Sequence, residues 1–248
     1  MHTRLAQRLC DCFGQELLDA SADEWGVRIY DQERPIRRVG WAAMLTPDVV
    51  QQCVSGGVDL LVTFHDAWPF LYQVREESLR LLGQSGLGHV WVHAPLGQAD
   101  FGSNAFLLER IGCASSRPYA LQEGFYMGRI GALPEEVPLE AVAARLEAAY
   151  GEAPRFVHDG GRPCRCVAVV TGGGCNTEYM RLALEEGRDT YITGEYNAYL
   201  AIYARGTGLN VLVFSHTYTE RYAALRLAER LFGADAGVEF VEIVEEHL

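Results

Sequence analysis

The chain has 248 residues, of which 49% are hydrophobic and 22% charged, as is usual for a globular protein with one large domain or two smaller lobes. Its 33 acidic side chains outnumber its 21 basic ones, and the net charge of −12 argues against nucleic acid as a partner, since phosphate binding needs clustered positive charge. All 21 basic residues are arginine, so P-loop nucleotidases, protein kinases and pyridoxal-phosphate enzymes, which each depend on a lysine, are excluded.

The cysteine content indicates a reducing compartment. Seven cysteines are present, an odd number, and the first residues lack the long apolar segment of a secretory leader. We therefore expect reduced thiols and a cytoplasmic location. No apolar run approaches the roughly 18 residues of a membrane-spanning helix, so we expect no association with a membrane.

The first 111 residues alternate short apolar segments with amphipathic ones. Residues 58–64 are almost continuously apolar, which indicates a strand buried on both faces. Thr46 followed by Pro47 is typical of a helix start. The predicted strands are 37–44, 58–64 and 89–93, and the predicted helices are 5–18, 46–56, 75–82 and 103–111.

The rest of the chain continues the alternation after a less regular middle. Residues 119–130 suit one or two strands, 134–138 a turn, 139–150 a helix, and 151–163 a loop or lobe boundary. We then predict strands at 166–170, 190–193, 210–214 and 238–244, and helices at 177–186, 195–204 and 219–232. This pattern predicts an α/β fold with mixed, largely parallel sheets flanked by helices. We expect a single domain over residues 1–248, with two α/β lobes and a connecting segment around 115–165.

Three polar clusters follow the ends of predicted strands, which is where open α/β sheets bind ligands. His65 and Asp66 follow the strand at 58–64, Glu195 follows 190–193, and His216 with Glu220 follows 210–214. A helix beginning by residue 217 would place the last two side chains on one face, where they can share a divalent ion such as Zn, Mn or Fe.

Each cluster also has a simpler explanation. His216 and Glu220 can be a solvated pair on a helix surface, and His65 can be a partly buried histidine whose hydrogen bonds are satisfied within the fold. Asp66 is either a further metal ligand or a partner that orients the imidazole of its neighbour.

Together the clusters resemble the NIF-three-like family, whose members are often labelled GTP cyclohydrolase 1 type 2 homologues. Members carry Thr-His-His-Pro after a buried strand, then Thr-Gly-Glu after another, then Gly-His with Glu four residues on. This sequence has Thr-Phe-His-Asp at 63–66, Thr-Gly-Glu at 193–195, and Ser-His at 215–216 with a glutamate at 220. The order and spacing match from about residue 15 to the C-terminus, and Asp189 to Glu195 is the most specific segment.

The resemblance implies a two-lobed fold, a homohexameric ring, and a two-metal site between the lobes built from five ligands. Three of these ligands are retained as His65, His216 and Glu220. The first histidine of the family's pair is replaced by Phe64, and the aspartate position is occupied by Gly97.

Three outcomes remain open for such a reduced site. One ion can be held by the retained ligands and water, the site can have lost its metal, or Asp66 or Asp100 can replace a missing carboxylate and restore two ions. One ion is the outcome that we expect, and the metal ligands that we predict are His65, His216, Glu220 and Asp66.

Two neighbouring segments allow further interpretations. Thr171 to Gly174 before a helix can expose backbone N–H groups to a phosphate, although a tight turn is the simpler role. The aromatic residues Trp68, Phe70 and Tyr72 can line a substrate pocket or pack onto the sheet.

Two functions follow from these observations. In the first, the protein is a metal-dependent hydrolase in which Glu195 acts as the general base on a nucleotide-like substrate, such as GTP or another purine nucleotide. In the second, it is a non-catalytic, ring-forming scaffold or regulatory binding protein with a degenerate metal site. In both we expect self-association, and a small-molecule or nucleotide ligand.

Overall fold

The computed structural model describes residues 2–28, 35–235 and 237–245. The chain divides into two compact units. Unit 1 is formed by residues up to 96 together with 221–247, and unit 2 is formed by residues 97–220. The two units are described separately below.

The sheet of unit 1 has five strands in the order β1-β4-β3-β2-β11. All neighbouring pairs are parallel except β1 with β4. Every residue of the central strand β3 is buried, as its apolar sequence predicts. The strands are β1 (Trp25–Arg28), β2 (Arg38–Ala42), β3 (Leu60–Thr63), β4 (Gly88–Val92) and β11 (Glu239–Glu242).

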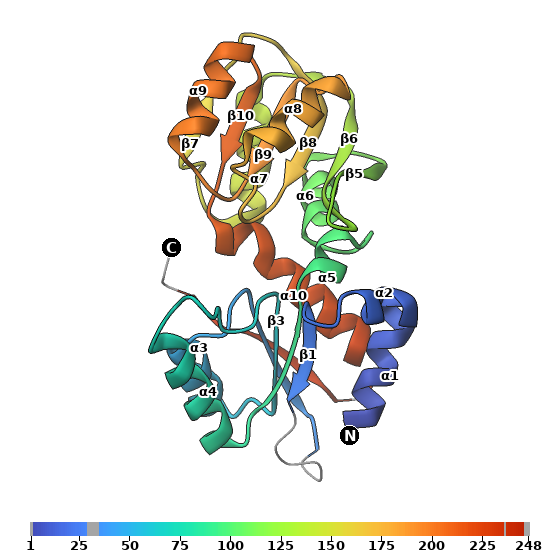
Figure 1. Ribbon diagram of the computed structural model, residues 1–248, viewed down its shortest axis with the longest axis vertical. Helices are drawn as coiled ribbons and strands as arrows, with labels where there is room; N and C mark the ends of the chain where they lie inside the picture. Colours follow the sequence, from blue (N-terminus) through green and yellow to red (C-terminus); the bar gives the residue numbers. More distant parts are fainter. Residues whose placement is uncertain (1, 29–34, 236, 246–248) are drawn as a thin grey trace. The chain divides into compact units, whose positions relative to one another are not determined.

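Helices cover both faces of this sheet. Figure 1 shows α3 and α4 on one face, with α1 and the adjoining part of α10 on the other. Arg8 of α1 binds Asp235, just past the end of α10, and lies over the ring of Phe232. The helices wholly in unit 1 are α1 (His2–Phe13), α2 (Gln15–Ala20), α3 (Pro47–Ser55) and α4 (Val74–Ser85), and α10 (His216–Phe232) crosses the division of the chain.

The sheet of unit 2 is mixed and has six strands in the order β5-β6-β8-β9-β10-β7. The three strands β8, β9 and β10 are parallel, and the outer pairings are antiparallel. Both β9 and β10 are buried at every position. The strands are β5 (Ser116–Gln122), β6 (Phe125–Val137), β7 (Phe156–His158), β8 (Cys164–Val170), β9 (Thr190–Thr193) and β10 (Asn210–Val213).

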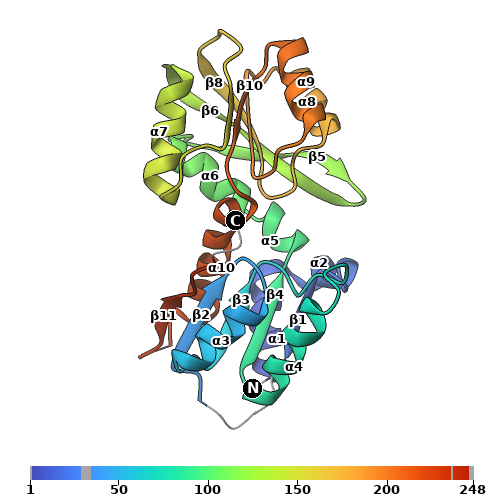
Figure 2. The same ribbon diagram turned by 90° about the vertical axis from the view of Figure 1, so that its left-hand side faces the viewer.

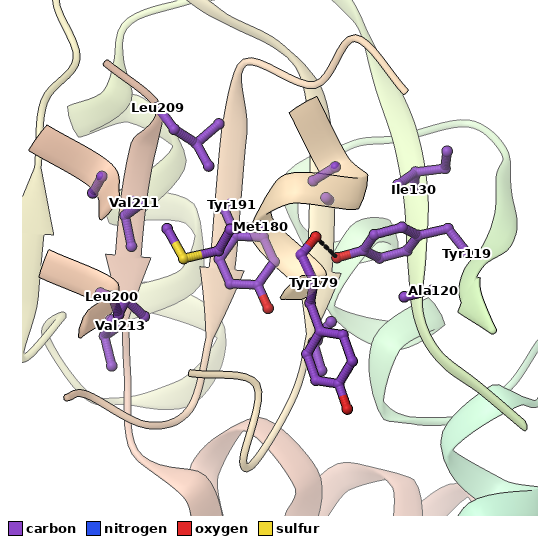
Figure 3. Packing of buried hydrophobic residues seen from close by; sticks show 14 residues of the cluster. Tyr119, Ala120, Ile130, Tyr179, Met180, Tyr191, Leu200, Leu209, Val211 and Val213 are labelled. Carbon is purple, nitrogen blue, oxygen red and sulfur yellow. Dashed lines mark hydrogen bonds between the residues drawn. The ribbon is translucent and has the colours of Figure 1, made fainter. Parts of the chain in front are cut away.

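Unit 2 also has helices on both faces, with α6 and α7 on one and α8 and α9 on the other (Figure 2). Met180 of α8 and Leu200 of α9 pack with Tyr191 of β9 in one buried apolar cluster (Figure 3). Within it, the Tyr119 hydroxyl donates a hydrogen bond to the backbone oxygen of Tyr179. The helices are α5 (Ala94–Gln98), which crosses the division between the units, α6 (Ser103–Ile111), α7 (Leu139–Tyr150), α8 (Thr177–Glu185) and α9 (Ala198–Thr207).

The predicted α/β fold with two mixed sheets flanked by helices is confirmed. Several local predictions were wrong. Residues 134–137 extend β6 instead of turning; Gly14, at φ 81°, separates α1 from α2; and β1, β7 and α5 were missed. The segment 115–165, expected to connect the lobes, lies within unit 2. Among the described residues, the helices lack the combination of length and apolar character that crossing a membrane requires.

Candidate metal centre

His216 and Glu220 form a pair at the start of α10, in which the glutamate is buried and the histidine is partly buried. The helix begins at His216, directly after the loop that follows β10. Because residues four apart lie on one helix face, the histidine Nε2 comes within 2.9 Å of the Glu220 Oε2 atom. The side chains are 17% and 5% exposed, respectively. The pairing predicted from the spacing of these two residues is therefore present.

Glu195 contacts the other nitrogen of the same imidazole. It follows β9 in a loop, because α9 starts only after Asn197, whose side chain caps that helix by accepting from the Leu200 N–H. The Glu195 Oε1 atom lies 2.7 Å from Nδ1 of His216. Its Oε2 atom is 3.7 Å from the Sγ atom of Cys175, which donates a weak hydrogen bond to it. Glu195 therefore fixes the orientation of the His216 ring.

The two carboxylates give this cluster an excess of negative charge. Burial lowers the pKa of His216, but the charge of Glu220 and the hydrogen bonds to both glutamates outweigh it and raise the pKa to about 10. The hydrogen bond from His216 in turn lowers the pKa of Glu195. Two carboxylates on one imidazole favour a cation between them, either a proton on His216 or a metal ion.

Two glycines leave space for these side chains. A Cβ atom on Gly172 would lie 2.1 Å from Glu220 Oε1 and 2.9 Å from His216 Nε2, and a Cβ on Gly194 would lie 2.9 Å from the His216 Cα. Gly172 also has a φ of +60°, which favours glycine. The glycine loop at 172–174 therefore serves as a close-fitting turn beside the glutamate.

The hydrogen bonds of that loop point to the same role. The N–H of Gly172 donates to Thr219 Oγ1, and the N–H of Gly174 donates to the backbone oxygen of Gly172. The hydroxyl of Tyr191 donates to the backbone oxygen of Gly174 at 2.6 Å. Two of the N–H groups that a phosphate would use are thus already engaged, as expected for a structural turn.

In unit 1, His65 follows β3 and is surrounded by rings. It is buried, and its backbone N–H donates to the Ala43 oxygen. The ring centres of Phe64, Trp68 and His93 lie 5.1, 5.0 and 4.6 Å from the centre of its imidazole. Phe64 thus packs against the histidine beside it, where the family pattern has a second imidazole.

Asp66 is engaged by an arginine. Arg28 donates to both of its carboxylate oxygens, at 2.7 and 2.8 Å. Burial raises the pKa of Asp66, but the hydrogen bonds and charge of Arg28 outweigh it, so the pKa is lowered. An ion bound to Asp66 would compete with this pairing. Its role as a metal ligand stays a prediction.

Gly97, which stands at the family's aspartate position, and Asp100, which could replace that aspartate, both lie in unit 2. The backbone oxygen of Gly97 accepts a hydrogen bond from the side-chain amide of Asn104, and the Asp100 side chain is exposed.

Unit 1 contains a carboxylate–imidazole pair of its own, which the sequence analysis did not predict. Nδ1 of His93, the residue after β4, forms a hydrogen bond with Glu24 Oε2, which lowers the pKa of Glu24. The segment around Glu24 offered no signal, because β1 itself was not predicted.

His65, His216 and Glu220 each offer one ligand atom, and the three form a group that can hold a metal ion. Two imidazole nitrogens and one carboxylate oxygen are a donor set suited to Zn and related divalent ions. These are three of the four metal ligands that the sequence predicts.

Comparisons with known proteins place the sequence and the fold in a known family. The family Duf34/NIF3 (NGG1p interacting factor 3) matches residues 3–247. A GTP cyclohydrolase 1 type 2 homolog from Halobacterium salinarum is 31% identical, over 81% of this chain and 82% of its own. One from Deinococcus radiodurans is 28% identical, over 83% and 79%. The crystal structure of TTHA1606 from Thermus thermophilus aligns with a TM-score of 0.79 at 25% identity, covering 98% of this chain and 97% of its own. The chain belongs to the Duf34/NIF3 family.

Proposed function

We propose that this protein binds one divalent metal ion through His65, His216 and Glu220 and hydrolyses a small nucleotide-like substrate. The observation that carries the proposal is the pair of His216 with the buried Glu220, with Glu195 on the other nitrogen of the same ring. Zn, Mn and Fe all suit the donor set. The nucleotide-like substrate is suggested by the name of the curated relatives, GTP cyclohydrolase 1 type 2 homolog.

The chemistry of the donors supports an ion in this place. A carboxylate as buried as that of Glu220 is costly unless a cation compensates its charge. Its neighbour His216 can meet that demand as an imidazolium, or as a neutral ring that shares an ion with the carboxylate. A divalent ion held by these residues would lower the pKa of a water molecule and polarise the bond to be cleaved.

Glu195 is the general-base candidate. Its Oε1 atom binds His216, while its Oε2 atom accepts a weak hydrogen bond from Cys175. The side chain is 44% exposed, so this second oxygen can accept a proton from a substrate or water. Its lowered pKa makes Glu195 a weak base, and its first task is to orient His216.

Titration with Zn²⁺ against a chromophoric chelator tests the ion site. We expect Glu220→Gln to weaken binding by more than about 100-fold, because it removes the one charged ligand. Glu178→Gln is the matched control, since this glutamate lies on the exposed surface of α8 and pairs with Arg181. Equal affinities of wild type and Glu220→Gln would contradict the site.

Hydrolysis of purine nucleotides by the metal-loaded protein tests the reaction. We expect the wild type to release phosphate or to open the ring of the base. We expect Glu195→Gln to lose this activity in preparations that still bind the ion. Absence of turnover in a wild-type protein that holds its ion would favour the second function, a non-catalytic binding protein. That function is supported by Phe64 and Gly97, which supply no side-chain ligand at two positions where the family pattern has them.

We also propose that the chain forms a homo-oligomer, a hexameric ring, in the cytoplasm. Exposed apolar side chains on and beside α9, namely Tyr196, Tyr199 and Ile202, are suited to contact another copy. The seven unpaired cysteines suit a reducing compartment. Light scattering of wild type and Ile202→Asp tests the assembly, with a loss of mass expected in the variant and equal monomer masses contradicting it.

A further inference from the structure

We propose that His93 is a second imidazole ligand from unit 1, binding the same ion as His65, with Glu24 as its positioning residue. The inference rests on the proposed function, because it adds a ligand to that ion. Neither the three-residue donor set nor the family pattern at residues 63–66 includes His93. The ligand is a divalent first-row transition ion.

The sheet of unit 1 brings the two histidines together. β3 and β4 are parallel neighbours, with Thr63 in register with Trp91. Each histidine comes two residues after one of this pair, so both stand at the carboxyl edge of the sheet, where ligands bind in α/β folds. The backbone N–H of His93 donates to the backbone oxygen of Glu24, which fixes its position at the strand end.

The geometry of the two rings suits a shared ion. Their centres are 4.6 Å apart, and their planes are inclined by 40°. Two imidazoles that bind one ion at roughly 2.1 Å leave their ring centres about 4.5–5 Å apart when the ligand angle is near that of a tetrahedron or octahedron. The inclined arrangement of His65 and His93 therefore has the separation of a ligand pair.

Glu24 prepares the ring of His93 for this role. Its carboxylate binds Nδ1, which leaves Nε2 as the ring nitrogen for an ion. Metal-binding histidines are commonly held by a carboxylate on the opposite nitrogen, which fixes the tautomer and makes the ligand more basic. Unit 2 has the same arrangement, in which Glu195 binds Nδ1 of His216.

Phe64 supplies no metal ligand beside His65. Its ring meets His65 and His93 nearly edge-on, with centres 5.1 and 5.5 Å away, and it is buried. A phenyl ring has no lone pair for a cation, so it can only wall the site. With His93 included, unit 1 would contribute two imidazoles, a type of donor that favours zinc-like ions over magnesium or calcium.

The test is Zn²⁺ affinity, measured by chelator competition, for wild type, His65→Ala, His93→Phe and His158→Phe. The His93→Phe change keeps an aromatic ring against His65 and removes only the ligand atom. His158 lies on β7 of unit 2 and controls for the loss of any histidine. Thermal unfolding without metal checks that each variant folds.

We expect His93→Phe to weaken Zn²⁺ binding at least about 10-fold, with His158→Phe unchanged. The visible absorption of the Co²⁺-loaded protein should also change in His93→Phe. If His65→Ala loses the ion while His93→Phe keeps full affinity and the wild-type Co²⁺ spectrum, the inference fails and the proposed function stands. If the wild type binds neither Zn²⁺ nor Co²⁺, both the inference and the proposed function fail.

Glu24 is tested by Glu24→Gln and Glu24→Asp. We expect the glutamine variant to lower Zn²⁺ affinity with an unchanged melting temperature in the metal-free protein. The aspartate variant, which keeps the charge, should recover part of that affinity. A purely structural role would move the melting temperature and leave the affinity unchanged, and that result would overturn the positioning role.

Discussion

Each unit contains a histidine whose Nδ1 atom is bound by a glutamate. The two histidines differ in the groups that lie beside the rest of the ring. In unit 2, His216 is bound by Glu195, and its Nε2 meets the buried Glu220. In unit 1, His93 is bound by Glu24, and its ring faces His65 and Phe64. Unit 2 thus concentrates negative charge, whereas unit 1 offers imidazoles among apolar rings.

The pKa of a third histidine, His89, is shifted in the opposite direction to that of His216. His89 of β4 is fully buried; Arg28 donates to its Nδ1, and its Nε2 lies 2.8 Å from Thr63 Oγ1. Burial and the arginine lower its pKa to about 3, although Asp66 opposes them. Burial therefore lowers the pKa of His89, whereas the two carboxylates beside His216 raise its pKa despite burial.

The largest expected effect concerns His89 and the stability of unit 1 in acid. The histidine of the unfolded chain takes up a proton near pH 6.5, whereas folded His89 resists it down to about pH 3. The free energy of unfolding should therefore fall as the pH drops through this window, by at most roughly 5 kcal/mol, with no effect above it.

Tryptophan fluorescence isolates this effect. All four tryptophans, at 25, 41, 68 and 91, lie in unit 1. Urea unfolding followed by their emission between pH 4 and 7 should give a steeper pH dependence for wild type than for His89→Gln. Equal slopes for the two proteins would show that His89 does not control acid stability.

A smaller effect is expected on Zn²⁺ affinity when Glu195 is replaced. It tests whether a carboxylate on Nδ1 of His216 prepares that ring for an ion. Glu195→Gln keeps a hydrogen-bond acceptor at Nδ1 of His216 but removes the charge. We expect Zn²⁺ affinity to fall about 10- to 100-fold, or about 1.4–2.7 kcal/mol, without loss of fold. Chelator competition measures it, and an affinity equal to that of Glu178→Gln would contradict the orienting role.

The smallest effect concerns the helix that follows the glycine loop of unit 2. The Asn176 side chain caps α8 by accepting a hydrogen bond from the Glu178 N–H. Asn176→Ala should cost about 1 kcal/mol of the stability of unit 2. Because this unit lacks tryptophan, circular dichroism should detect the change and tryptophan emission should not. A shift in the tryptophan transition would show that the two units unfold together.

The sequence predicts the parallel core of both units because short strands alternate with helices, and β3, which follows an almost continuously apolar run, is buried at every position. It also predicts the His216–Glu220 pair, since a helical spacing of four fixes that contact. The edge strands β1 and β7 were missed because they are short and only partly buried, so neither alternation nor a continuous apolar run marks them.

The other features that were not predicted depend on contacts between segments that are distant in the sequence. Arg28 reaches Asp66, and Glu24 reaches His93, only because β1 lies beside β4. A strand pairing of that kind leaves no pattern in the local sequence. The role of Gly172 beside Glu220 depends in the same way on a tertiary contact, although its glycine-rich loop was visible.

The most direct measurement for the account is the metal content of protein purified without chelator, by mass spectrometry, for wild type and His216→Ala. We predict about one zinc-like ion per wild-type chain and its loss in the variant, with both proteins folded. No ion in the wild type, or the same content in both proteins, would contradict a metal centre built on His216 and Glu220.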